Sequence, residues 1–265
     1  MKTATRPDVG AMLREWRMRR RISQMELALV VGISPRHLSF VETGRSQPGR
    51  ATLLNLAEAL DVPLRERNVL LLAAGLAPAY AEHGLEDSAL AIAHEAVQLI
   101  LRAHEPFPAL AIDRSWNLVL ANRAVMPLLA GVAPHLLQPP VNVLRLSLHP
   151  EGVAPRIENL PEWRAHLLAR LRREAAMSGS EELRALLEEL AAYPGGESRH
   201  EAQRDAIVVP LRLRTPGGTL SFFSTTTVFG TPLEVTLAEL ALESFFPADR
   251  ATAAALGRVE LPAAK

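Results

Sequence analysis

Apolar residues recur at helical spacing through residues 1–76, in five short segments separated by Gly, Pro or polar turns. The first segment, 9–19, places Met12, Leu13 and Trp16 on one side. Two segments follow around Gly32, and two more, after Arg50 and after Pro63, carry leucines that would close a core. This pattern predicts an all-α domain of five helices.

The two segments around Gly32 carry the clearest local signals. Ser23 and Glu26 have the spacing of a capping box, and Gly32 is free to take the positive φ that ends a helix in a tight turn. Ser34 then suits an N-cap, followed by Pro35 at the first helical position. The second helix is expected to turn its polar side outward, and that side consists of Arg36, His37, Ser39 and Glu42. Two such helices joined by a glycine turn form a helix-turn-helix.

From residue 77 the pattern changes, which indicates a second domain. Residues 77–105 are expected to form a linker and a connecting helix, because a proline and a glycine interrupt the periodicity before 87–103 resumes it. We expect this helix to join the domains or to pack two copies of the chain together. Residues 106–255 are then the second domain, and 256–265 are a tail.

Alternation with a period of two predicts strands near the start of the second domain. Residues 109–112 and 116–121 flank a short turn, and Asn122 begins a helix. Further along, Trp163, Leu167 and Leu171 stand four residues apart on one helical face, and a second leucine-rich helix covers 181–192.

A hairpin is predicted near the end of this domain, with strands over 206–214 and 220–229 around a Pro-Gly-Gly turn. The stretch from Thr231 to Glu234 resembles a capping box and predicts a helix as far as Phe245. An α+β domain with an antiparallel sheet follows from this order. Helices between its early and late strands would enclose apolar space in which a small ligand fits.

Composition and charge agree with two folded domains. The chain has 265 residues, of which 48% are hydrophobic and 22% charged, with no net charge. The charge is divided unevenly, since residues 1–76 hold 12 basic and 7 acidic residues and residues 77–265 hold 17 and 22, giving +5 and −5. A basic small domain joined to an acidic larger one indicates that the first meets a polyanion such as DNA.

Other features exclude several protein classes. The chain has no cysteine, so it has no disulfide, thiolate metal site or cysteine nucleophile. No secretory signal is recognisable, and the longest uncharged apolar run, Val69 to Ala81, interrupted by Pro78, is too short for a membrane span. We therefore expect a cytoplasmic protein without a membrane partner.

The first domain resembles the helix-turn-helix domain that phage repressors share with XRE-type bacterial regulators, over residues 9 to about 76. The residues that carry this resemblance are Gln24, Ala28, Gly32, Ile33, Leu38, Glu42 and Gly44. It implies binding to double-stranded DNA by a homodimer whose two recognition helices enter major grooves about 34 Å apart.

The same resemblance implies a set of DNA contacts. Ser34, Arg36, Ser39 and Phe40 would face the bases, and Arg45 and Arg50 the phosphates, while Gln24 would hold a phosphate or an adjacent side chain. Arg36 is the first candidate for specificity, since a good arginine–guanine contact is worth about 1–3 kcal/mol. His37 is either a phosphate contact or a surface residue. The full predicted set is Gln24, Ser34, Arg36, His37, Ser39, Phe40, Arg45 and Arg50.

The second domain resembles the MmyB-like ligand-binding domain, a PAS-related sensor found behind such a helix-turn-helix. The stretches that carry this resemblance are 116–124, 142–146, His149-Pro150, 162–164, 171–173 and 224–231. The two resemblances together cover about residues 9–255. They imply a transcription regulator that senses a small apolar or amphipathic molecule, with a fatty acid or another lipid-like metabolite as the expected type. The sequence departs from the family pattern at 195–205, which is short and polar here.

Ligand contacts are expected from apolar side chains that would surround a buried chain, at about 0.8 kcal/mol for each buried methylene. Three cationic or imidazole groups would pair with a carboxylate. The same apolar residues equally suit a plain core, and the cations a neighbouring glutamate. On the hairpin, the face of Leu220, Phe222 and Ser224 is expected to point inward. The predicted set is Trp116, Arg145, His149, Arg156, Trp163, Leu167, Leu171, Leu220, Phe222 and Ser224.

Two other functional classes were compared with a ligand sensor. An enzyme is not expected, because the zinc-peptidase pattern fails at both candidates, where Gln98 and Arg204 replace the second histidine, and no phosphate loop or nucleophile elbow is present. No catalytic residue, metal or cofactor is therefore predicted, apart from a bound lipid-like ligand. The alternative is an antitoxin-like repressor controlled by a protein partner, with no small-molecule ligand.

Overall fold

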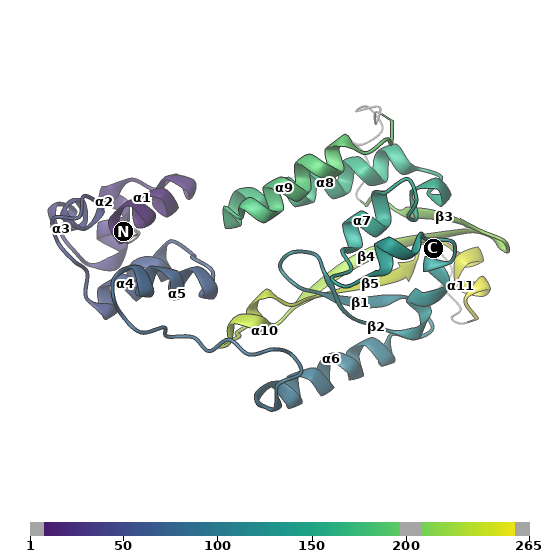
Figure 1. Cartoon of the computed structure of the whole chain (residues 1–265), viewed down its shortest axis with the longest axis horizontal. Coiled ribbons are helices and arrows are strands. Elements are labelled where there is room, and N and C mark those ends of the chain that lie inside the picture. Colours follow the sequence, from purple (N-terminus) through teal and green to yellow (C-terminus); the bar gives the residue numbers. More distant parts are fainter. Residues whose placement is uncertain (1–7, 197–207, 258–265) are drawn as a thin grey trace, which may run out of the picture. The chain divides into compact units, whose positions relative to one another are not determined.

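The computed structural model describes residues 8–196 and 208–257 of the chain. The chain divides into two compact units (Figure 1). The first consists mainly of the residues up to His83, and the second contains most of the remainder.

The N-terminal part of the first unit, up to His83, contains five helices, as the apolar spacing predicts. They are α1 (Val9–Arg19), α2 (Gln24–Val31), α3 (Pro35–Glu42), α4 (Arg50–Ala59) and α5 (Leu64–Ala73). Their apolar sides meet in one core, in which Leu13, Trp16 and Leu38 are buried. The predicted all-α domain is confirmed.

The local signals around Gly32 act as expected. The Ser23 side chain accepts from the Glu26 backbone, the Glu26 carboxylate accepts from the Ser23 backbone, and Gly32 has φ +75°. Ser34 accepts from the backbone N–H of His37 and so caps α3. Both helices are therefore fixed by short-range hydrogen bonds at their N-termini.

The second unit is built on a five-stranded antiparallel sheet in the order β2-β1-β5-β4-β3. The strands are β1 (Ala109–Ile112), β2 (Leu118–Ala121), β3 (Leu211–Thr215), β4 (Gly218–Val228) and β5 (Ala241–Pro247). The last strand in the sequence lies in the middle, paired with β1 through Leu110 and Glu243 and with β4 through Ser224 and Phe245. The second domain is α+β with an antiparallel sheet, as predicted.

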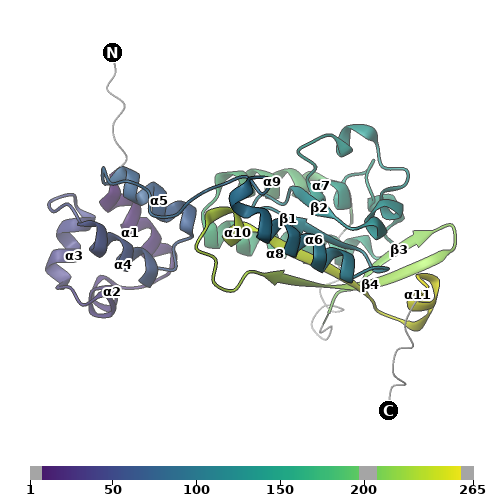
Figure 2. The ribbon, with the colours of Figure 1, turned by 90° about the horizontal axis from the view of Figure 1, so that it is seen from below.

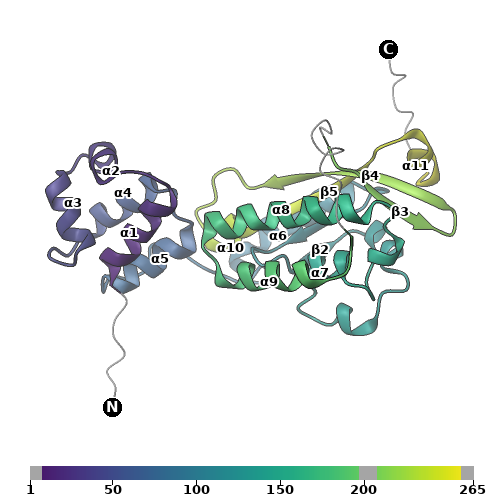
Figure 3. The same ribbon diagram turned by 90° about the horizontal axis from the view of Figure 1, so that it is seen from above.

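Helices lie on both faces of this sheet. One face is covered by α6 (Ala91–Ala103), which buries Val97 and Leu101 against β1 and β5. The opposite face packs against α7 (Val143–Leu148), α8 (Leu160–Ser178) and α9 (Glu181–Ala192). Figure 3 shows α8 and α9 in front of the sheet, and α6 lies beyond it. The remaining elements are η1 (Ser88–Leu90), η2 (Arg123–Leu129), η3 (Pro134–Leu137), η4 (Ala154–Arg156), α10 (Val235–Glu239) and α11 (Arg250–Ala255).

The predicted helix ending at Phe245 is wrong. Only the short α10 forms, with the Glu234 carboxylate accepting from Leu237 N–H, and residues 241–247 are the central strand β5. The spacing of Leu237 and Leu240 suits a helix, but the sheet needs a strand between β1 and β4. Pairing on both sides satisfies the backbone of β5, and this tertiary requirement overrides the local pattern.

Trp116 lies outside the strand predicted for it. It occupies the turn before β2 with φ +64°, and the Asp113 carboxylate accepts from the N–H groups of Ser115 and Asn117 around it. The first hairpin strand also begins later than expected, at Leu211. Of its predicted residues, 206 and 207 lie outside the described part of the chain.

Candidate DNA-contacting surface and ligand cavity

The outward side of α3 brings two arginines to one aromatic ring. The guanidinium carbon of Arg36 lies 5.4 Å from the centre of the Phe40 ring, and that of Arg45 lies 5.9 Å from it. Arg36 and Arg45 are exposed, and Phe40 is half-buried. Two cations held by one ring form a compact basic surface at the position where a recognition helix meets DNA.

The other predicted residues of α3 flank this group. Ser34 is exposed at the N-cap, while His37 and Ser39 are half-buried along the helix. The Ser34 hydroxyl oxygen accepts from His37 N–H, and the hydroxyl proton of Ser34 remains available as a hydrogen-bond donor. The structure thus brings six of the eight predicted DNA-contacting residues to one helix and the turn after it.

Gln24 and Arg50 are instead bound within the unit. Gln24 Nε2 donates to Glu42 Oε2 at 2.7 Å, the adjacent-side-chain role that was one of its two expected roles. Arg50 Nη1 donates to the Ala77 carbonyl at 2.6 Å, and Nη2 to that of Pro78 at 3.3 Å. Two Arg50 donors therefore attach the start of α4 to the segment after α5.

Glu42 was expected on the outward side of α3, and that expectation is wrong. Its side chain is 1% exposed and forms an ion pair with Arg17 of α1, with Nε to Oε1 at 2.6 Å. Burial alone would raise the pKa of Glu42, but hydrogen bonds from Arg17 and Gln24 outweigh burial and hold that pKa below its usual value. Glu42 is thus a charged anchor between α1, α2 and α3.

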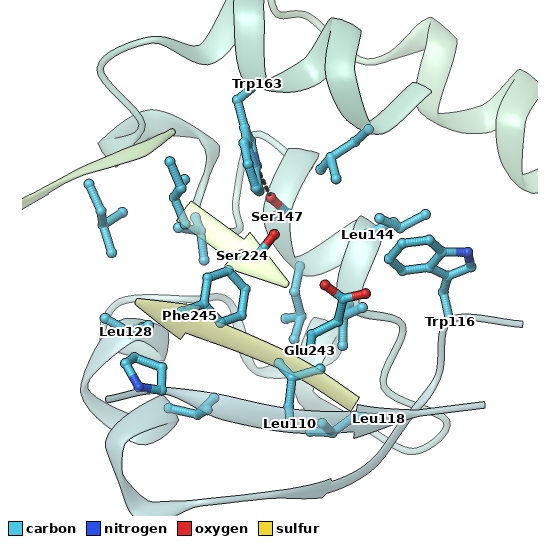
Figure 4. A pocket seen from close by; sticks show the side chains of 18 of the residues that line it. Leu110, Trp116, Leu118, Leu128, Leu144, Ser147, Trp163, Ser224, Glu243 and Phe245 are labelled. Atoms are coloured by element: carbon cyan, nitrogen blue, oxygen red, sulfur yellow. Dashed lines mark hydrogen bonds between the residues drawn. The ribbon is translucent and has the colours of Figure 1, made fainter. Parts of the chain in front are cut away.

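A cavity of about 120 Å³ lies in the second unit, between the sheet and α7 and α8 (Figure 4). Leu110, Leu118, Leu144 and Phe245 are among its lining side chains, and most of the wall is apolar. Four of the predicted ligand-contacting residues line it, which are Trp116, Trp163, Leu167 and Ser224. The cavity belongs to one unit and is formed by elements far apart in the sequence.

Polar groups interrupt the apolar wall at a few points. Trp163 Nε1 donates to Ser147 Oγ at 3.0 Å, as the dashed line in Figure 4 shows, and Ser224 is drawn nearby. Glu243, whose side chain is 6% exposed, pairs with Arg170 through Nη2 and Oε1 at 2.6 Å. A cavity with apolar walls and a small number of polar groups suits an amphipathic molecule.

Arg170 is held on several sides. Its guanidinium lies over the Trp116 ring at 4.4 Å, and its Nε donates to Glu174 at 3.0 Å. Burial by itself lowers the pKa of Arg170, but the Glu243 and Glu174 carboxylates raise it, and the net shift is upward. Arg170 therefore stays charged at the wall of the cavity.

His166 also lines the cavity, in surroundings that favour its neutral form. Burial is the main cause that lowers its pKa, and the charges of Arg170 and Arg173 lower it further. Its ring stacks on Trp163, with centroids 5.7 Å apart. A neutral imidazole offers one hydrogen-bond donor and one acceptor to a ligand.

Six predicted ligand-contacting residues do not line this cavity. Arg145 pairs with Glu189 at 2.8 and 2.7 Å, and its donors lower the pKa of Glu189. Arg156 donates to the carbonyl of Leu128, a lining residue, and so supports the wall from outside. The other four lie in the hydrophobic core or at its edge: His149, Leu171, Leu220 and Phe222.

Most of the lining residues were not predicted from the sequence, and three of these are titratable. His166 and Arg170 follow Trp163 at helical spacing on α8, so the sequence held a signal for them. Glu243 had none, because 241–245 was assigned to a helix, whereas β5 carries Glu243 into the sheet opposite Thr226 of β4. Residues 197–205, where the sequence departs from the family pattern, lie outside the described residues.

One group of side chains has the composition of a metal site. Among the described residues, His135, His149 and Glu151 bring three candidate ligand atoms within 4.8 Å of one another. His149 Nδ1 accepts from the backbone N–H of Glu151 at 3.0 Å, so in the neutral ring the proton is on Nε2. Binding a metal through either ring nitrogen would change that arrangement, and we assign the group no metal.

Comparison with known families agrees with this architecture. Residues 93–258, more than half of the chain, match the MmyB-like transcription regulator ligand binding domain. This chain belongs to that family. Residues 13–67 of this MmyB-like regulator match a helix-turn-helix family. It is therefore a DNA-binding helix-turn-helix transcription regulator with a ligand-binding domain, and the families it matches are those of regulators rather than enzymes.

Solved structures of two regulators are similar to parts of the MmyB-like regulator. The restriction-modification controller protein C.AhdI from Aeromonas hydrophila is 34% identical over 24% of this chain and 98% of its own, with a TM-score of 0.23. The clp gene regulator ClgR from Corynebacterium glutamicum is 28% identical over 40% and 99%, with a TM-score of 0.24. No curated protein matches the chain. Among the described residues, no helix is both long enough and apolar enough to cross a membrane.

Proposed function

We propose that the MmyB-like regulator binds a specific DNA operator as a homodimer and that a small amphipathic molecule in its cavity controls this binding. The helix-turn-helix would correspond to residues 1–76 and the ligand domain, PAS-like in kind, to 106–255, with 77–105 between them. The protein would act in the cytoplasm, where its DNA target lies. The proposal depends on one observation, an apolar cavity with a few polar groups inside the domain that matches a ligand-binding family.

The group of Arg36, Phe40 and Arg45 supports the DNA part of the proposal. A ring that holds both guanidinium groups reduces the rotamer freedom that they would lose on binding. Arg36, on α3 itself, would reach base edges in the major groove, and Arg45, in the turn after α3, would reach a phosphate. Ser34, His37 and Ser39 would add contacts beside them.

The lining of the cavity supports an amphipathic ligand. Its leucines, tryptophans and Phe245 would enclose a hydrocarbon chain, and burial of each methylene would contribute about 0.8 kcal/mol. Ser147, Ser224, His166 and Arg170 offer hydrogen bonds to a polar head. We propose a fatty acid or a similar lipid-like metabolite as the ligand class.

Two measurements on the full-length protein test these proposals separately. Mass spectrometry of small molecules extracted from the purified protein, compared with a blank, should find a lipid-like compound in a stoichiometric amount. Selection from a random duplex pool should return a roughly palindromic site, bound more weakly as salt rises. A selection that yields no common sequence would overturn the DNA proposal, whatever the extraction finds.

The alternative is control by a protein partner, as in antitoxin-like repressors. Stable co-purification of one unrelated polypeptide, together with an extract that matches the blank, would favour this alternative. No specific observation in the described residues favours it, whereas the cavity favours a ligand.

A further inference from the structure

Helix α6 has two apolar faces, and the sheet uses only one of them. Val97 and Leu101 are buried against Ala109, Ala111 and Leu242. The opposite side carries a second apolar stripe at spacings of four, three and four residues, formed by Ile92, Ala96, Leu99 and Ala103. Four residues at these spacings lie within about 60° of one another around a helix, so they form a continuous stripe.

This outer stripe faces away from its own unit. Ile92 is 86% exposed and Leu99 63% exposed. Figure 2 shows α6 in front of the sheet, with none of the labelled elements of the second unit in front of it. Large apolar side chains in such a row on a helix are typical of an interaction surface rather than of an ordinary solvent-facing helix.

We propose that the outer stripe of α6 binds the same stripe of a second copy of the chain, with the two helices antiparallel. The charges beside the stripe select this partner and this direction. Glu95 and Arg102 are both exposed on the same flank, seven residues apart, and neither forms an ion pair with another described residue. A two-fold axis midway between them, beside Leu99, puts Glu95 of each copy opposite Arg102 of the other.

The parallel arrangement fails this charge test. In a parallel pair the two-fold axis runs along the helices, so one flank of each copy lies beside the opposite flank of the other. Glu95 and Arg102 would then face the flank that carries Ile100 in the other copy instead of facing each other. An antiparallel pair keeps the charged flanks on the same side and forms two reciprocal ion pairs. An unrelated protein would need a matching pair of charges, which a second copy has by symmetry.

The side chains of the stripe also suit close packing about that axis. Leu99 lies next to the two-fold axis, and the small residues Ala96 and Ala103 stand one turn before and one turn after it. Small residues around a leucine let helix axes approach to about 8 Å. Ile92 lies at the end of the contact, about 3 Å along the helix beyond the level of Ala103 of the other copy.

This interface fits the DNA proposal, on which its biological meaning rests. The two α6 N-termini would lie roughly 22 Å apart along the helices, at 1.5 Å per residue. Residues 84–90 connect His83 to α6, and the last three of them form η1. The two helix-turn-helix units of this dimer would occupy major grooves about 34 Å apart.

Single cysteines test the geometry, because the chain has no cysteine of its own. Under mild oxidation, full-length Leu99→Cys should form a covalent dimer, since the two residues meet at the axis. Ile92→Cys should not, because its two copies would be about 20 Å apart. Cross-linking of both variants would indicate parallel helices, and cross-linking of neither would show that this stripe is not the interface. Either result overturns the proposal.

The oligomeric state in solution provides an independent test that needs no DNA. Sedimentation of full-length Leu99→Glu should show at least a tenfold rise in the dimer dissociation constant. Met126→Glu is the matched control, because Met126 on η2 is 66% exposed, close to the 63% of Leu99. A dimer unaffected by Leu99→Glu, with an unchanged circular dichroism spectrum, would contradict the interface even if the protein still bound DNA.

A charge exchange remains informative if Leu99→Glu does not fold. Glu95→Arg and Arg102→Glu should each weaken the dimer several-fold, because each puts like charges opposite one another. The double variant should restore the wild-type dissociation constant, since the reciprocal pairs form again with the signs exchanged. If the losses of dimer affinity in the two single variants simply add in the double variant, these two residues do not meet, and the antiparallel arrangement is overturned.

Discussion

The carboxylate of Glu42, at the end of α3, accepts from Nε and Nη2 of Arg17, in α1, at 2.6 and 2.9 Å. Arg17 is 12% exposed at its side chain and also donates to the Ile22 carbonyl, before α2. The pair therefore holds the recognition helix against the two helices that precede it. Hydrogen bonding to Glu42 raises the pKa of Arg17, while burial opposes it, so the guanidinium keeps its charge.

Loss of this pair should destabilise the first unit. Glu42→Gln removes the negative charge and leaves the Arg17 cation poorly compensated. The free energy of unfolding should fall by about 3 kcal/mol, which is the low end for a buried pair because Arg17 keeps some contact with solvent. Urea unfolding followed by circular dichroism measures this loss. The control is Glu15→Gln, because Glu15 is 69% exposed in its pair with Arg19 and should cost below about 0.5 kcal/mol. Equal effects of the two substitutions would contradict an anchoring role for Glu42.

The same pair should make stability depend on pH in a defined direction. The folded-state pKa of Glu42 is lowered, so its contribution is complete above the unfolded-state value of about 4.3 and is lost as pH falls through the folded value. The difference in unfolding free energy between wild type and Glu42→Gln should be constant from pH 7 to 5 and shrink below about pH 4. If this difference in unfolding free energy grew on acidification, the pKa of Glu42 would be shifted in the opposite direction.

Arg36 and Arg45 should affect DNA binding in different ways. Arg36→Ala should reduce the preference for one base position by about 1–3 kcal/mol, because a base contact is lost. Arg45→Ala should weaken all duplexes to a similar extent and lower the slope of log affinity against log salt by about 1. Fluorescence anisotropy with a selected site and a scrambled site measures both. Arg123→Ala, in the second unit, is the control, and an Arg36→Ala protein with unchanged preference would remove Arg36 from the base contacts.

Filling the cavity should prevent ligand binding without unfolding the protein. Leu110→Trp adds bulk to a lining residue, and overpacking of this kind typically costs about 1–3 kcal/mol. Titration with a fluorescent fatty acid should show at least tenfold weaker binding. Leu137→Trp adds the same bulk on η3, away from the lining residues, and should bind as wild type does. Equal binding by both variants would mean that the probe occupies another site.

The Arg170–Glu243 pair should behave as one unit. Arg170→Met leaves the buried Glu243 without its counter-charge and should lower the unfolding free energy by about 3–5 kcal/mol, whereas Glu243→Gln leaves Arg170 its second carboxylate partner, Glu174, and should cost less. The double variant should cost less than the sum of the two, because the buried charge of Glu243 is removed together with its partner. Thermal unfolding of the three variants measures the coupling, and strict additivity would show that the pair is not coupled.

The sequence by itself determined the five helices of the first unit and their order. Capping at Ser23 and Ser34 and the positive φ of Gly32 depend on neighbours within a few residues, so local chemistry decides them. The apolar spacing also placed the core residues Leu13, Trp16 and Leu38 correctly. The antiparallel sheet of the second domain followed from alternation at its two ends.

Only the tertiary structure decided which side chains meet. Glu42 looks like a surface residue of an amphipathic helix until Arg17, 25 positions earlier, is folded against it. Glu243 looks like part of a helix until β1 and β4 pair with its strand on both sides and bring it to Arg170. Arg145 pairs with Glu189 and not with the cavity for the same reason. These partners are distant in sequence, and a pattern with a period of two or four residues carries no information about them.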